Sequence, residues 1–293
     1  MNGLHPVDLN RKLACFTLDF EGDRWWAGHT RCEMLEQPAL FARFQHLIEV
    51  YNIKLTVFVV GKMFETHPEY IDRLAGLGAT FELHSYSHDT TMPDSETEIQ
   101  LAKQAYYKFF SCNPRGYRAP IGLISNQGLQ TLREEGFIYD ASVLPSRRFD
   151  EFGFNHLDKP TTPWIYDPGT SPFVELPFGV IPKIRLPISL SYLKLLGWPL
   201  YRTLLHMFGL PRALVFNSHP YDYFLTDAVR EWPNWKRYVH LRNINRSIQI
   251  LTQFLELLQK QGYEFISMQE LYDRVCQQAG LNLASDNSDT VRS

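Results

Sequence analysis

The sequence has few of the features that mark secreted, membrane-spanning or nucleic-acid-binding proteins. Only four cysteines occur in 293 residues, and no two lie close together, so neither a disulfide framework nor a cysteine metal site is expected. The net charge is −3, which argues against the basic surface of a nucleic-acid-binding protein. Residues 1–12 lack the apolar region of a secretory signal. We therefore expect a cytoplasmic protein with free thiols.

Long apolar runs are also missing. A membrane span needs roughly 20 uninterrupted apolar residues, and the most apolar stretch, residues 186–210, is broken by Pro187, Gly197, Pro199 and Gly209. This stretch is typical of a pair of buried or half-buried helices. The alternative is an interfacial patch that docks on the inner face of a membrane carrying a lipid-linked substrate. Nothing in the sequence indicates the oligomeric state.

The rest of the chain alternates strand-like and helix-like segments, which is typical of a parallel α/β protein. Strands are expected at residues 13–20, 55–60, 80–83, 116–118, 137–139, 213–217 and 263–266. A Gly-x-Gly-x-x-Gly motif does not follow the first strand, which disfavours an open dinucleotide-binding sheet.

The sequence therefore predicts an α/β fold consisting of a single distorted (β/α) barrel of seven or eight strands. We expect an N-terminal extension at residues 1–12 and the barrel at residues 13–278. Long loops are predicted at residues 145–210 and a disordered tail at residues 279–293, where Asn, Ser and Asp are frequent.

Titratable side chains follow the carboxyl ends of several expected strands. In chain order they are Asp19 and Glu21, His84 and His88, Arg118, and His219. The carboxyl ends of parallel strands meet at one end of a barrel, which is where barrel enzymes build their active sites. We therefore expect these side chains to share one cavity.

The two histidines, His84 and His88, are spaced four residues apart, so they can lie on one face of a helical turn and bind one divalent ion, with zinc as the expected metal. Either Asp19 or Glu21 could complete the ligand set, because residues two apart in an extended segment point to the same side. The other carboxylate could act as general base towards a water that the ion acidifies. An ordinary packed histidine pair is the structural alternative.

Arg118 and His219 supply the remaining chemistry. Arg118 precedes a rigid turn at residues 119–122, and its guanidinium could grip a carboxylate and keep it ionised. A backbone N–H of that turn could stabilise an oxyanion. His219 is a candidate general acid for a leaving amine. Taken alone, each residue could equally have a structural role.

Together these motifs resemble those of the polysaccharide deacetylases, also called the NodB-homology or carbohydrate esterase family 4 enzymes. Residues 84–88, His-Ser-Tyr-Ser-His, correspond to His-Ser/Thr-x-x-His, and residues 118–122, Arg-Ala-Pro-Ile-Gly, correspond to Arg-x-Pro-x-Gly. The segment at residues 136–142 and the motif ending in His219 follow in the expected order, so the resemblance covers about residues 13–275. It implies a distorted barrel and metal-dependent removal of an acyl group, usually acetyl, from a sugar.

The resemblance also implies roles for the six residues. His84 and His88 would bind the metal, Asp19 would be the base, Arg118 would orient it, and His219 would be the acid. The first motif departs from the common Thr-Phe-Asp-Asp, because residues 17–21 read Thr-Leu-Asp-Phe-Glu. In an Asp-x-Glu branch of the family the ligand comes one residue later, so Glu21 is the expected metal ligand.

Several residues near these motifs could contact a sugar. The expected substrate-binding residues are Trp25, Trp26, Ile121 and Tyr221, and Trp164 and Tyr223 are further aromatic candidates for stacking. Trp25 and Trp26 are favoured because adjacent residues are not easily buried in one core. Arg147 and Arg148 could bind a phosphate or an acidic sugar, or could be a solvated pair.

The expected function is a metal-dependent hydrolase that removes an N-acetyl group from a sugar of a polysaccharide or a lipid-linked glycan. A deformylase or cyclic-amide hydrolase is an alternative, because the same activated water would attack any accessible amide. A barrel that binds glycan without turnover is a second alternative.

Overall fold

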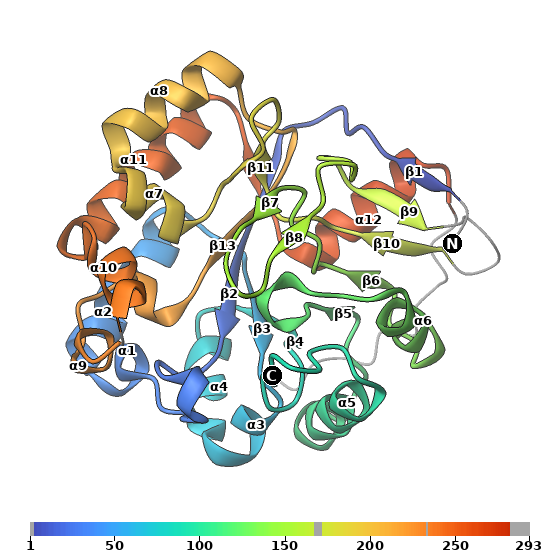
Figure 1. Cartoon of the computed structure of the whole chain (residues 1–293), viewed down its shortest axis with the longest axis horizontal. Helices are drawn as coiled ribbons and strands as arrows, with labels where there is room; N and C mark the ends of the chain where they lie inside the picture. Colours follow the sequence, from blue (N-terminus) through green and yellow to red (C-terminus); the bar gives the residue numbers. More distant parts are fainter. Residues whose placement is uncertain (1–2, 167–171, 233, 282–293) are drawn as a thin grey trace.

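A computed structural model describes residues 3–166, 172–232 and 234–281 of the chain. Its centre is a ten-stranded sheet with the order β1-β9-β10-β6-β5-β4-β3-β2-β13, and β14 pairs with β2 beside this path. Figure 1 shows the helices arranged around the outside of this sheet. The sheet is mainly parallel, as predicted for a distorted α/β barrel.

The strands of the sheet are short apart from β2. They are β1 (Leu4–Pro6), β2 (Leu13–Phe20), β3 (Leu55–Val59), β4 (Thr80–Leu83), β5 (Gly116–Tyr117), β6 (Tyr139–Asp140), β9 (Trp164–Tyr166), β10 (Phe173–Glu175), β13 (Ala213–Ser218) and β14 (Glu264–Phe265). All except β1 and β9 pair in parallel. The parallel strands in the described part of the chain therefore number eight, within the predicted range of seven or eight.

The helices connect these strands and cover the sheet. They are α1 (Glu33–Glu36), α2 (Pro38–Val50), α3 (Lys62–Thr66), α4 (Pro68–Ala75), α5 (Glu96–Phe110), α6 (Asn126–Glu134), α7 (Leu190–Leu196), α8 (Trp198–Phe208), α9 (Asp227–Arg230), α10 (Asn234–Leu241), α11 (Ser247–Lys260) and α12 (Met268–Gln278). Ser95 and Ser125 cap the starts of α5 and α6, where their side chains accept hydrogen bonds from the backbone N–H groups of Glu98 and Gly128.

Strand β2 shows how the sequence places the site. All eight of its residues are buried, as expected for a parallel strand covered on both faces. Its even-numbered residues, such as Phe16 and Phe20, pack in the large hydrophobic cluster together with side chains of the outer helices. The odd-numbered Leu13 and Cys15 belong to a second cluster inside the barrel, where α12 covers the amino ends of the strands. Because side chains alternate along a strand, Asp19 continues the inner face at the opposite, carboxyl end.

Irregular backbone, rather than a strand pair, closes the barrel. After β10, the N–H of Leu176 bonds to the carbonyl of Asp140 at 2.8 Å and the N–H of Phe178 bonds to Val143 at 3.0 Å. The next residue, Gly179, donates to the carbonyl of Val215 in β13 at 2.8 Å. Residues 176–179 therefore connect the β6 side of the sheet to β13. The barrel is distorted at this point, because it is closed by irregular backbone and not by paired strands.

Residues 145–210 differ from the long loops that were expected. Two small hairpins lie there, β7 (Arg147–Arg148) with β8 (Phe154–Asn155) and β11 (Val180–Ile181) with β12 (Leu186–Pro187). Strands β9 and β10 also fall within residues 145–210. They belong to the main sheet, where β9 pairs with β1 and β10 pairs with β6. Strands of two or three residues leave too short a pattern to predict.

The apolar stretch at residues 186–210 forms the two helices α7 and α8, which confirms the expected helix pair. In the described residues, no helix combines the length and apolar character needed to cross a membrane. Of the predicted disordered tail, residues 282–293 lie outside the described residues, while the N–H groups of Ala279 and Leu281 bond to the end of α12.

Candidate active site

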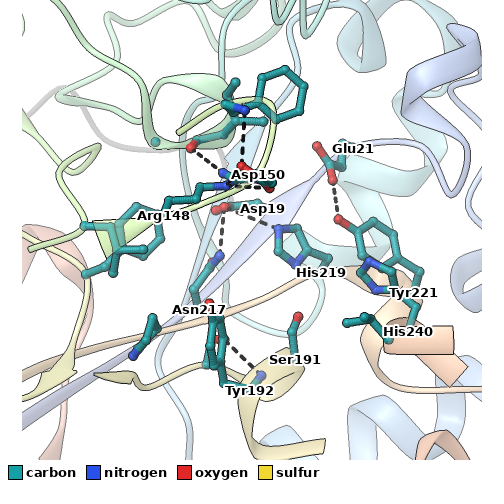
Figure 2. A pocket seen from close by; sticks show the side chains of 18 of the residues that line it. Asp19, Glu21, Arg148, Asp150, Ser191, Tyr192, Asn217, His219, Tyr221 and His240 are labelled. Atoms are coloured by element: carbon teal, nitrogen blue, oxygen red, sulfur yellow. Dashed lines mark hydrogen bonds and ion pairs between the residues drawn. The ribbon is translucent and has the colours of Figure 1, made fainter. Parts of the chain in front are cut away.

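Five of the six predicted reactive side chains line one cavity of about 500 Å³ at the carboxyl ends of the parallel strands. They are Asp19, Glu21, His84, His88 and His219. The sixth, Arg118, is fully buried and contacts Asp19 directly. Figure 2 shows Asp19, Glu21 and His219 around this cavity, together with Asn217 and Tyr221.

The loop that carries the two histidines is held in a specific shape. Ser85 and His88 have φ values of 59° and 60°, and the hydroxyl of Ser85 accepts a hydrogen bond from the N–H of His88 at 3.1 Å. The carboxylate of Glu98, on α5, accepts hydrogen bonds from the N–H groups of Tyr86 and Ser87 at 3.1 and 2.8 Å. It also accepts one from the hydroxyl of Ser87 at 2.8 Å. Glu98 thus fixes the loop that carries the two histidines.

Glu21, His84 and His88 form a compact group whose ligand atoms all lie within 4.8 Å of one another. Oε2 of Glu21 lies 2.5 Å from Nε2 of His88 and 3.9 Å from Nε2 of His84. Nδ1 of His84 is 2.7 Å from the carbonyl oxygen of Arg118. Because a carbonyl can only accept, Nδ1 carries the proton and Nε2 keeps its lone pair for a ligand. Two imidazoles and one carboxylate fit the donor set of a divalent metal site with open positions.

The protonation states of His84 and Glu21 also suit a metal. Burial lowers the pKa of His84 to about 4, so its imidazole is neutral at pH 7. Burial alone would raise the pKa of Glu21, but the charge and hydrogen bond of His88 outweigh it and lower the pKa to about 2. Metal ligands must be deprotonated, and both side chains are already in that form.

Asp19 is held by a separate set of contacts. Its Oδ1 accepts a hydrogen bond from Nη1 of Arg118 at 2.5 Å, and its Oδ2 accepts one from Nδ2 of Asn217 at 3.0 Å. The guanidinium carbon lies 3.9 and 4.4 Å from the ring centroids of Phe58 and Phe178. Burial alone would raise the pKa of Asp19, but the charge of Arg118 lowers it below its usual value. Asp19 is therefore an ionised carboxylate with a fixed orientation.

His219 lies near Oδ2 of Asp19, whereas Arg118 contacts Oδ1. Its Nδ1 is 3.0 Å from Oδ2 of Asp222, and its Nε2 is 3.8 Å from Oδ2 of Asp19. The ring stacks on Tyr221 with a centroid distance of 4.8 Å. Burial would lower the pKa of His219, but the hydrogen bond and charge of Asp222 raise it to about 9. The imidazole is consequently protonated at neutral pH.

The predicted substrate-binding residues have different positions. Trp25, Ile121 and Tyr221 line the cavity, with the ring of Trp25 4.7 Å from that of His88. The hydroxyl of Tyr221, however, donates to Oε1 of Glu21 at 2.6 Å, so it is engaged by the Glu21, His84 and His88 group. Trp26 is not among the residues that line the cavity, and its ring packs at 4.1 Å against Trp232.

Two aromatic candidates were wrong. Trp164 and Tyr223 are 0% and 4% exposed and pack in the hydrophobic core, because Trp164 lies within strand β9 and Tyr223 packs against Phe44. Proximity to a motif in the sequence did not bring these rings to the cavity.

The arginine pair at the rim does reach the cavity. Nε of Arg148 bonds to the carboxylate of Asp150 at 2.8 Å, and its Nη1 donates to the carbonyl of Ile121 at 3.0 Å. Figure 2 shows the Arg148 and Asp150 pair among the residues that line the cavity. Arg148 is therefore tied to the turn after Arg118 and is not a freely solvated side chain.

Residues 33–139 match the family model of the polysaccharide deacetylases. This segment contains His84, His88 and Arg118, while Asp19, Glu21 and His219 lie outside it. The peptidoglycan deacetylase-like protein FGM2 of Gibberella zeae is 29% identical over 158 residues, a match that covers 47% of this chain and 46% of that protein. The chain thus spans about half the length of this curated relative.

Two solved structures share the fold. A Mycobacterium smegmatis protein with a proposed polysaccharide deacetylase function has a TM-score of 0.57 and 18% identity, covering 99% of this chain and 100% of that one. The Bc1960 peptidoglycan N-acetylglucosamine deacetylase has a TM-score of 0.55 and 14% identity, covering 92% of each chain. The chain is therefore similar to the polysaccharide deacetylases in the sequence of residues 33–139, and it shares the fold of these two solved structures.

Proposed function

We propose that this chain is a metal-dependent deacetylase that removes an N-acetyl group from a sugar of a polysaccharide or a lipid-linked glycan. One observation carries the proposal: a Glu-His-His metal group and an acid–base pair, Asp19 and His219, meet in one cavity. The likeness to peptidoglycan deacetylases supports an N-acetylated glycan as the substrate.

Glu21, His84 and His88 would hold the ion, and their donor atoms suit zinc best. When bound, such an ion polarises the acyl carbonyl and makes an attacking water more acidic. Tyr221 and the carbonyl of Arg118 orient two of these ligands through hydrogen bonds.

Asp19 accepts the proton of the attacking water. Its ionised state and its hydrogen bonds to Arg118 and Asn217 support this role, because a general base must be deprotonated and correctly oriented before the reaction. Arg118 and Asn217 act through Asp19 and are positioning residues.

His219 donates a proton to the leaving nitrogen. Its Nδ1 is engaged by Asp222, so Nε2 is the nitrogen available on the cavity side. Water oxygen bonds to the acyl carbon as the carbon–nitrogen bond breaks, and the proton from His219 lets the nitrogen leave as a neutral amine. Trp25 and Ile121, at the cavity wall, are placed to contact the sugar and its acyl group.

We extend the proposal to the location of the protein. All four cysteines are free thiols, which supports a reducing, cytoplasmic compartment. Leu200 and Met207 on α8 are 51% and 61% exposed and support a peripheral contact with a membrane that carries a lipid-linked substrate. Co-sedimentation with lipid vesicles tests this contact, and protein that stays in the supernatant contradicts it.

The activity is tested by restoring zinc to the purified protein and measuring acetate released from N-acetylglucosamine oligomers and lipid-linked sugars. Zinc-dependent acetate release that is lost in Asp19→Asn supports the proposal. Zinc-loaded protein that releases no acetate from an exhaustive panel overturns it. Formate or a ring-opened acid as the product would indicate the deformylase or cyclic-amide hydrolase, and failure to bind any divalent ion would favour a non-catalytic glycan-binding barrel.

A further inference from the structure

The lysine of α7 occupies a position that an apolar residue would normally fill. Lys194 is completely buried, and it shares the core-facing side of the helix with Leu190 and Leu193. A buried ammonium group is strongly unfavourable unless an opposite charge is placed against it. This arrangement therefore requires an explanation beyond packing.

The partner of Lys194 is the carboxylate that also binds His219. Nζ of Lys194 lies 2.9 Å from Oδ1 of Asp222, while Oδ2 of Asp222 lies 3.0 Å from Nδ1 of His219. Ser191, one turn earlier on α7, donates to Oδ1 of the same carboxylate at 2.8 Å. Asp222 itself is fully buried. Its two oxygens thus connect α7 on one side to His219 on the other.

The backbone on both sides of this connection is fixed. The side chain of Asn243 donates to the carbonyl of Lys194 at 2.7 Å, and the hydroxyl of Ser247 donates to the carbonyl of Asp222 at 2.6 Å. Lys194 does not line the cavity. Its Nζ also donates to the backbone carbonyl of His240 at 3.4 Å, but Asp222 is its charged partner and the link to His219.

We propose that Lys194 is a positioning residue for His219: its ammonium keeps the Asp222 carboxylate charged and fixed, so that His219 stays oriented with Nε2 towards Asp19 and the cavity. The catalytic consequence rests on the proposed deacetylase function. The effect on His219 itself can be measured without turnover.

The charges around His219 determine the direction of the expected change. Asp222 on its own turn, Asp19 in β2 and Glu21 just after β2 all favour the protonated imidazole. The ring of Tyr221 stacks on the imidazole. Burial lowers the pKa of His240, on α10, to about 4, so this neighbour is neutral at pH 7.

Lys194 offsets part of this negative charge. Removing its positive charge makes every nearby group hold its proton more tightly. The pKa of His219 therefore rises further when Lys194 becomes neutral.

The experiment compares Lys194→Met with the unchanged protein, both zinc-loaded. The titration of the His219 imidazole is followed by NMR and assigned from the signal missing in His219→Gln. We expect the pKa of His219 to rise by about one unit. Given deacetylase activity, the alkaline limb of kcat/KM should move up by a similar amount and kcat should fall about tenfold.

Two variants serve as controls. Lys103→Met removes a lysine that pairs with Glu135 at 3.1 Å between α5 and the end of α6, away from the cavity, and should leave the titration of His219 unchanged. Lys194→Arg keeps the positive charge and should restore a titration close to that of the unchanged protein.

An unchanged pKa of His219 in folded Lys194→Met overturns the inference. If that variant does not fold, Lys194→Gln carries the same test, and if neither folds while Lys194→Arg does, Lys194 is a structural residue and the positioning role is wrong. A shifted titration without acetate release in the unchanged protein overturns the deacetylase proposal alone. Acetate release without a shifted titration overturns this inference alone.

Discussion

Tyr221 donates a hydrogen bond of 2.6 Å to Oε1 of Glu21, while Oε2 of the same carboxylate lies between Nε2 of His88 and Nε2 of His84. The tyrosine thereby leaves one oxygen of Glu21 directed at the two imidazoles. Tyr221 belongs to the same short turn as His219. One turn therefore carries both the proposed acid and the residue that supports a proposed metal ligand.

Tyr221→Phe should weaken zinc binding. It removes the hydrogen bond that orients Glu21, and losing such a partner of a metal ligand typically lowers affinity by about 10- to 100-fold. The affinity is measured by competition with a chelator. Tyr223→Phe is the matched control, because its hydroxyl contacts Ser218 at 2.8 Å and is not bonded to Glu21. Equal zinc affinity in Tyr221→Phe and the unchanged protein would contradict the assignment.

The two carboxylates of the first motif should separate into different roles. Glu21→Gln should lose zinc and therefore activity, because Glu21 is the carboxylate that faces both histidines. Asp19→Asn should keep its zinc, because Asp19 contacts Arg118 and Asn217 instead, and should lose about 10²- to 10⁴-fold in turnover. Metal analysis beside acetate release distinguishes the two. Loss of zinc in Asp19→Asn with retention in Glu21→Gln would reverse the assignment.

Glu98→Gln should loosen the histidine loop. The carboxylate of Glu98 accepts hydrogen bonds from two backbone N–H groups and one hydroxyl of that loop. The neutral amide cannot accept all three as strongly, so unfolding free energy should fall by about 1–3 kcal/mol, and zinc affinity should fall with it. Glu96→Gln is the control on the same helix turn, since Glu96 contacts only Gln100 among the hydrogen bonds of the described residues. Urea unfolding that gives equal losses for the two variants would contradict this role.

The stability of the metal-free protein should decline between neutral and alkaline pH through His219. Its folded pKa is raised to about 9 from the usual 6.5, so the folded state holds this proton more tightly than the unfolded chain does. The contribution, about 3 kcal/mol, is complete below pH 6.5 and is lost as pH rises through 9. Urea unfolding at pH 6.5 and 9.5 measures it. His219→Gln should show a smaller decline, and an identical decline in both proteins would refute the contribution of His219.

The strand-end residues of the site could be predicted because parallel strands end at a common edge. His84, Arg118 and His219 each follow a strand, and that rule alone was enough to bring them to one place. The rule is geometric and needs no knowledge of side-chain contacts.

Contacts between distant side chains could not be predicted in this way. Asn217 stands two residues before His219, yet no local pattern says that its amide turns towards Asp19. The role of Lys194 has no local signal either, because its partner Asp222 is brought to it by the fold. Tyr221 was expected to meet a sugar, and only the packed turn shows its hydroxyl at Glu21.

Strand β10 was missed for a related reason. It has three residues and pairs in parallel with β6. The two strands are separated in the chain by β7, β8 and β9. Whether so short a segment forms a strand depends more on the strand it pairs with than on its own sequence.

The position of β2 in the sheet imposes an order on biosynthesis. One edge of β2 is covered by β3, the next strand in the chain, and the other by β13, where Thr17 bonds to a carbonyl 199 positions later. A nascent chain on the ribosome therefore holds the whole Glu-His-His group while this second edge is still open. His219, the proposed proton donor, follows β13 and comes later in the chain than Glu21, His84 and His88. The residues proposed to bind metal are therefore synthesised before the residue proposed to complete the reaction.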